Sequence, residues 1–180
     1  SLHKIAGDIR LLVSGPVGGL AEVRVPALQA GSSIMPGKVN PVIAEAVQQV
    51  VAQVVGNDAT ITFAATMSTL QLNTAAPVIA RSIVSSVSLL ARAAEALDRQ
   101  CIRGLEVDAD RMRSIALRSP ALVTALAPHL GYEAAADLVH RAVTEGRSLS
   151  EVALDAGVPA GLVAASTDLL RLAGVEDDPN

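Results

Sequence analysis

Apolar residues recur every three or four positions along much of the chain, which is the spacing of an amphipathic helix. The first such run extends from Leu2 to Leu12 and stops at the helix breaker Ser14-Gly15-Pro16. A second extends from Pro41 to about Val55, and the longest from Pro77 to about Leu97. The second run is rich in β-branched residues, which lower intrinsic helix propensity, so neighbouring helices must stabilise it. The pattern predicts an all-α fold built from long, packed helices.

Two interruptions divide these runs. Gly56-Asn57-Asp58 is predicted to break or kink the second helix, with a further helical piece over 59–70. Glycine and proline are frequent over 16–39, which predicts an extended loop, and a connection this long within a compact domain is more often functional than not. Arg10 and Arg24 flank the loop. Either could bind a carboxylate, but we interpret both as solvated charges or as partners of Asp8 or Glu22.

The pattern changes after Gly104, where shorter helices alternate with turn residues. We therefore predict a helical-bundle segment over 1–104 and a small helical C-terminal domain over 105–180. The expected short helices are 108–118, 120–127, 133–145, 148–156 and 160–172. Ser148, followed three residues later by Glu151, predicts a capping box.

The segment Gly31–Pro41 (GSSIMPGKVNP) carries the candidate chemistry. Asn40 and Pro41 form a helix start signal, with asparagine as N-cap and proline at the first helical position. Backbone N–H groups, the partial positive charge of the helix start and Lys38 favour an anion there. Ser32 and Ser33 are candidate proton acceptors if their surroundings stabilise an alkoxide. A solvated loop that leads into a capped helix is the alternative interpretation.

Composition narrows the class of protein. The chain has 180 residues, of which 51% are hydrophobic and 18% charged, as in a globular protein, but one Phe, one Tyr and no Trp imply a core of small aliphatic side chains. A net charge of −4 with scattered arginines argues against a nucleic-acid partner. The single Cys101 excludes an internal disulfide and fits a cytoplasmic location. No signal peptide or membrane span is expected, and a start at Ser1 within a helix suggests a piece of a longer protein.

The string Gly31–Pro41 resembles the signature loop of the fumarase/aspartase superfamily, whose members eliminate a group from the β-position of a carboxylate to release fumarate. Three more segments resemble the family: 8–16, 56–58 with 71–73, and 122–132. Together they cover nearly the whole chain. The resemblance implies the long-helix bundle of that fold, followed by a small helical C-terminal domain.

The resemblance also implies roles for residues of this chain. Ser32 matches the catalytic base, and Ser33, Lys38 and Asn40 match substrate-binding positions. Glu45 matches a catalytic glutamate that supports a histidine from another part of the active site. His3, His129 and His140 have no motif match to that histidine, and no metal or cofactor is expected. The chain would then carry one of three segments that converge from different subunits of a homotetramer on a small dicarboxylate.

The leaving group distinguishes two members of the family. Leu70-Gln71-Leu72-Asn73 and Leu28-Gln29-Ala30 resemble aspartate ammonia-lyases, whereas 122–132 and 104–106 resemble class II fumarases. The first resemblance favours elimination of ammonia from L-aspartate, with class II fumarate hydratase as the alternative. A non-catalytic helical assembly module is a third possibility, which the intact Ser32, Lys38, Asn40 and Glu45 argue against.

Overall fold

The computed structural model of the protein describes residues 1–29, 35 and 37–175. The chain divides into two compact units, Ser1–Asp108 and Ala109–Asn180. Both units are helical, so the predicted all-α fold class is confirmed.

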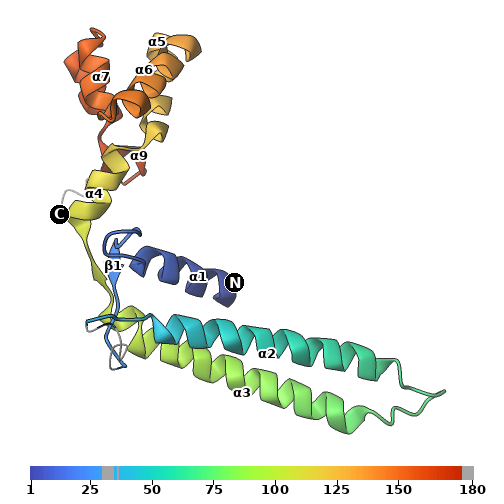
Figure 1. Ribbon diagram of the computed structural model, residues 1–180. Helices are drawn as coiled ribbons and strands as arrows, with labels where there is room; N and C mark the ends of the chain where they lie inside the picture. Colours follow the sequence, from blue (N-terminus) through green and yellow to red (C-terminus); the bar gives the residue numbers. More distant parts are fainter. Residues whose placement is uncertain (30–34, 36, 176–180) are drawn as a thin grey trace. The chain divides into compact units, whose positions relative to one another are not determined.

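Three helices make up most of the first unit: α1 (Leu2–Val13), α2 (Val42–Ala65) and α3 (Ala76–Gln100). Helices α2 and α3 lie side by side along most of their length and are joined by a turn at one end (Figure 1). The buried core lies where α1 packs on α2 and where α3 ends. It consists largely of small side chains, as the composition predicted: Ala6, Ile9, Ala44, Val47, Ala93, Leu97 and Cys101.

The predicted break at Gly56-Asn57-Asp58 is wrong, because α2 continues through these residues. The Asn57 side chain accepts a hydrogen bond from Gln53 at 3.1 Å and donates one to Ser86 of α3 at 2.9 Å. Asn57 therefore links the two long helices instead of ending one. Glycine inside a helix costs about 1 kcal/mol relative to alanine, so packing against α3 must offset the weak propensity at Gly56.

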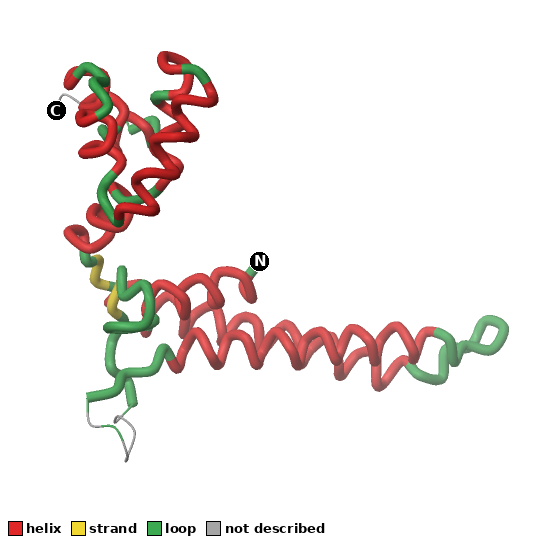
Figure 2. The backbone as a smooth tube through the Cα atoms, turned by 45° about the horizontal axis from the view of Figure 1, so that its top comes forward, coloured by secondary structure: helices red, strands yellow, loops and turns green. Residues whose placement is uncertain are grey.

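A two-stranded antiparallel pairing was not predicted. Strand β1 (Val23–Arg24) pairs with β2 (Glu106–Val107), with Val23 opposite Val107 and Arg24 opposite Glu106 (Figure 2). The Asp108 amide extends the contact by donating to the Glu22 carbonyl at 2.9 Å. Residues 105–108 therefore belong to the first unit, and the boundary falls after Asp108, close to the position near residue 104 that the sequence predicted. Strands of two residues leave no periodic pattern that a sequence could reveal.

The second unit packs short helices around one apolar core. After the 3₁₀ turn η1 (Ile102–Gly104) and β2, the elements are α4 (Ala109–Leu117), η2 (Pro120–Ala125), α5 (Ala127–Leu130), α6 (Tyr132–Glu145), α7 (Leu149–Asp155), α8 (Ala160–Ser166) and α9 (Leu169–Leu172). Its core comprises Leu122, Leu126, Leu138, Leu149, Val152, Ala153, Val158 and Val163.

Two of the predicted short helices differ from the structure. The run 120–127 is a 3₁₀ helix followed by the short α5, and 160–172 is split after Ser166. Asp168 starts α9 there by accepting a hydrogen bond from the Arg171 amide at 3.2 Å. The apolar pattern predicted both runs, but it does not show where such a local cap restarts a helix.

One helical run in the described part of the chain, Ala76–Gly104, is long and apolar enough to cross a membrane by length and composition, with a mean hydropathy of 1.3 in its most apolar window. Core helices of soluble proteins meet the same criterion, so the run assigns no membrane location.

The predicted capping box at the start of α7 is confirmed. The Ser148 amide donates to the Glu151 carboxylate at 2.9 Å, and the Ser148 hydroxyl accepts from the Glu151 amide at 3.3 Å. The backbone hydrogen bond from Ser148, followed by that from its hydroxyl, lowers the pKa of Glu151 below its ordinary value of 4.5. The ionised carboxylate therefore stabilises the folded state at neutral pH.

A depressed folded-state pKa contributes stability that is present above the unfolded pKa and lost as the pH falls through the folded value. We expect wild type to be more stable than Glu151→Gln at pH 7 and the difference to shrink at an acidic pH below 4.5, as the pH falls through the lowered pKa. Thermal denaturation of both proteins at the two pH values measures this. Glu133→Gln, in the first turn of α6, should show no such change; an equal change there would mean that the cap is not its cause.

Candidate active site

The candidate site lies where the loop Gly31–Pro41 enters α2. Ser32 and Ser33 lie outside the described residues. Lys38 is exposed, and its amide donates to the Met35 carbonyl at 3.2 Å, closing a turn in which Gly37 has a φ of +80°. A residue with a side chain is strained at that φ, so glycine suits the position.

The sequence predicted that Asn40 is the N-cap of α2, and this prediction is wrong, because no side chain caps the helix. The N-cap residue is Pro41, and the Asn40 carbonyl accepts from the Val42 amide at 2.8 Å. The helix therefore starts one residue later than predicted, which makes Val42 its first residue. Within the described part of the chain the carboxamide of Asn40 and the ammonium of Lys38 have no hydrogen-bond or ion-pair partner, so both can meet an anion near the start of a 24-residue helix.

Glu45 lies in the first turn of α2 and faces α1. Its carboxylate Oε1 is 3.9 Å from Nη2 of Arg10, while Nη1 of the same arginine donates to Oε1 of Gln48 at 2.6 Å. Glu45 and Gln48 are three residues apart on one face of the helix, so a single arginine reaches both. Arg10 is exposed, as expected of a solvated charge, but its partners are Gln48 and Glu45 and not the predicted Asp8 or Glu22. The sequence offered no signal for this contact, because helices α1 and α2 are separated by a long loop.

Arg24 is exposed, as expected of a solvated charge, but its partner is neither of the predicted residues Asp8 and Glu22. Its guanidinium lies 3.7 Å from the Asp108 carboxylate, next to the short sheet. Its acidic partner is therefore a residue distant in sequence. Mostly exposed pairs of this kind contribute little to stability.

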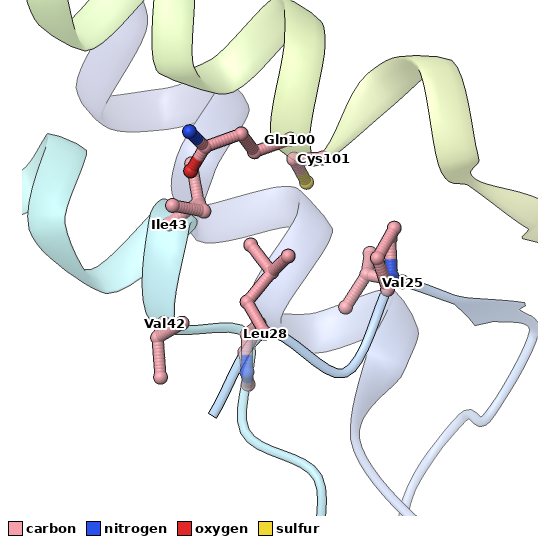
Figure 3. Close-up of a pocket in the computed structure, with 8 residues that line it drawn as sticks. Val25, Leu28, Val42, Ile43, Gln100 and Cys101 are labelled. Atoms are coloured by element: carbon pink, nitrogen blue, oxygen red, sulfur yellow. The ribbon is translucent and has the colours of Figure 1, made fainter. Parts of the chain in front are cut away.

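Residues on both sides of the candidate loop line a small apolar hollow (Figure 3). It is lined by Val25, Pro26 and Leu28 before the loop, by Pro41, Val42 and Ile43 after it, and by Gln100 and Cys101 at the end of α3. Burial raises the pKa of the Cys101 thiol. Pro26 packs so closely on Gly104 that a Cβ there would lie 2.5 Å from the Pro26 ring. The ends of the loop are thus held by packing.

The described residues contain no group of three or more His, Cys, Asp or Glu that could hold a metal ion. His3, His129 and His140 are all exposed, and none lies in the polar cluster formed by Arg10, Glu45 and Gln48. The site residues that the structure describes are therefore one ammonium, one carboxamide and one arginine-paired carboxylate.

Comparisons with known proteins agree with this architecture. The model of a family described as "Lyase" matches residues 1–56, and that of "Fumarase C C-terminus" matches residues 122–169. A fumarate lyase:delta crystallin structure from Brucella melitensis, solved with cobalt bound, superposes with a TM-score of 0.89 at 49% identity, covering 96% of this chain and 37% of that one. The class II fumarase of Schistosoma mansoni gives 0.85 at 34% identity, covering 93% and 36%.

The chain belongs to the fumarase/aspartase superfamily of lyases. Among curated relatives, Fumarate hydratase class II 1 of Pseudomonas aeruginosa is 50% identical over 87% of this chain and 34% of its own length. The aspartate ammonia-lyase of Bacillus subtilis is 44% identical over 86% and 32%. The chain thus spans about a third of the length of these relatives. Class II fumarases are more similar to it than this aspartase, contrary to the preference drawn from 28–30 and 70–73.

Proposed function

We propose that the chain supplies the signature-loop portion of a lyase that interconverts L-malate and fumarate, as class II fumarate hydratases do. The observation that supports this most is the identity of 46 to 51% to seven such enzymes over 86 to 89% of the chain. The candidate residues at the start of α2 fit the same reaction.

In this proposal Ser32 removes a proton from the carbon next to a carboxylate of the substrate. That carbon acid is very weak, so the main difficulty is the second negative charge that develops on the carboxylate. Lys38, Asn40 and the start of α2 stabilise this charge, and Ser33 contacts the substrate. Donors aimed at a developing charge are each worth about 100- to 1000-fold in turnover. Glu45 orients a histidine contributed by another part of the assembled site.

The active site is completed by segments outside this chain, in a homotetramer. Exposed apolar side chains on α2 and α3 support the assembly: Phe63 is 72% exposed, Val84 68% and Val87 63%. Large apolar surfaces on a helix pair are usually covered by a partner. Alone, the 180-residue chain is expected to have no turnover.

Elimination of ammonia from L-aspartate is the second candidate. It is supported by the resemblance of 70–73 to aspartases and by the 44% identity to the Bacillus subtilis enzyme. In the structure these residues form the tip between α2 and α3, where Thr69 and Leu72 pair and the Asn73 side chain accepts from the Ala75 amide at 3.0 Å. That hydrogen bond shapes the turn, so the resemblance at Asn73 is compatible with a structural role alone.

The test is to supply the protein, at its natural full length, with L-malate and separately with L-aspartate, and to follow fumarate absorbance. We expect fumarate from malate. Fumarate from aspartate alone would replace the proposal by the ammonia-lyase, and no fumarate from either substrate would overturn both.

A further inference from the structure

We propose that Arg10 is a positioning residue of the active site, which orients the Glu45 carboxylate through its positive charge and offsets part of the carboxylate's own charge. The inference rests on the proposed function, in which Glu45 orients a histidine from elsewhere in the assembly. Arg10 lies in the segment 8–16 that resembles the family, but neither the motif nor the resemblance gave it a role. The geometry of the α1–α2 contact gives it one.

The packing of α1 on α2 restricts where the Arg10 side chain can lie. Under it, Ala6 and Ile9 of α1 pack on Ala44 and Val47 of α2, and three of these four side chains are 1% exposed or less. Small side chains let the two helices approach closely, and the core beneath the polar groups limits their relative movement. Arg10 follows Ile9 directly, so its stem leaves the chain at the edge of this core.

Gln48 holds the guanidinium. It accepts from Nη1 of Arg10 at 2.6 Å, and its amide nitrogen lies 3.4 Å from where a Cβ on Gly7 would stand. This is an ordinary van der Waals distance, so the Gln48 amide lies directly against α1.

The other terminal nitrogen of the guanidinium, Nη2, lies 3.9 Å from Oε1 of Glu45. Lys4 and Asp8, the other charged groups on the same stretch of α1, pair with each other. Arg24, on the strand that follows the helix, pairs with Asp108. Among the described residues, Arg10 is thus the cation that lies next to Glu45. The segment that leads into α2 contains one basic residue, Lys38.

At 3.9 Å, Nη2 is too far from Oε1 for a hydrogen bond, so Arg10 acts on Glu45 through its charge and leaves the carboxylate able to accept a hydrogen bond from an imidazole. The arginine then acts in two ways. Its charge attracts Oε1 and so favours one orientation of the carboxylate, and the same charge reduces the preference of the imidazole for its protonated form. Loss of the arginine should therefore change both turnover and the pH at which the imidazole titrates.

The experiment measures the pH profile of kcat/KM for fumarate formation by the full-length protein and its variants. For Arg10→Ala we expect kcat/KM to fall by about 5- to 30-fold. The apparent pKa of the histidine in the pH profile should rise by roughly half a unit. Both effects are modest because the Arg10 and Glu45 side chains are partly exposed and solvent screens their charges. Arg10→Lys should restore the pH at which the profile bends but only part of kcat/KM, since lysine keeps the positive charge but lacks the two terminal nitrogens of the guanidinium.

Two further variants separate this role from a structural one. Gln48→Leu should shift the apparent pKa in the same direction as Arg10→Ala, because the guanidinium loses its anchor, whereas Lys4→Ala on the same helix should leave rate and profile unchanged. An Arg10→Ala enzyme with the wild-type rate and profile overturns the inference. So does a slower enzyme whose apparent pKa stays in place and which lysine does not restore. A wild-type protein without fumarate release would instead overturn the proposed function itself.

Discussion

Replacing Ser32 with alanine should reduce fumarate formation by the full-length protein by about 100- to 10,000-fold, because a positioned general base contributes that much to a proton transfer. The KM should change far less than kcat, since the hydroxyl acts mainly in the transition state. The oligomeric state and the melting temperature should stay as in wild type. Steady-state kinetics, size-exclusion chromatography and thermal denaturation measure these quantities.

Ser114→Ala is the matched control for this substitution. Ser114 is an exposed serine on α4, and its loss should leave the rate unaltered. A Ser32→Ala enzyme with undiminished turnover would remove the serine base from the proposed mechanism. A parallel loss of assembly would mean that the loop is structural, as in the non-catalytic alternative.

Replacing Leu126 with alanine should destabilise the C-terminal unit by about 2 to 5 kcal/mol, the range for truncating a buried leucine. Leu126 is 1% exposed and belongs to the core formed by η2, α6, α7 and α8. Small domains are stable by only about 5 to 15 kcal/mol, so the loss is a large fraction of the total. Urea denaturation followed by circular dichroism measures it.

Leu154→Ala provides the comparison within the same unit. Leu154 is 48% exposed on α7, and its truncation should cost well under half as much. Equal effects at the two positions would show that Leu126 is not in the core that the structure describes.

The fold was predictable from sequence where a periodic pattern fills a long element. The apolar stripe along 77–97 predicted α3, and the Ser148–Glu151 spacing predicted the cap of α7. Prediction failed where a distant partner decides the local structure. Asn57 is a common turn residue, but here Ser86 on another helix receives its hydrogen bond. The pairing of Val23 with Val107 joins segments that share no local signal.

In the candidate site, too, features set within one segment were predictable and contacts between distant segments were not. The motif located Lys38, Asn40 and Glu45, since their chemistry depends on spacing within one segment. It could not predict that the α2 cap is Pro41, a choice between neighbouring residues set by backbone geometry. Nor could it predict that Arg10 faces Glu45, because that contact depends on how α1 packs against α2.

Cys101 gives the protein a built-in reporter. It is the single thiol of the chain, 2% exposed, and it lines the hollow that clamps the residues on either side of the signature loop. Because alkylating reagents attack the thiolate, a buried thiol with a raised pKa reacts only when its surroundings open. The labelling rate of this sulfur therefore reads out how often the base of the loop separates from the end of α3. A bound dicarboxylate that keeps the hollow closed would slow this labelling, and no substitution in the chain is needed to observe it.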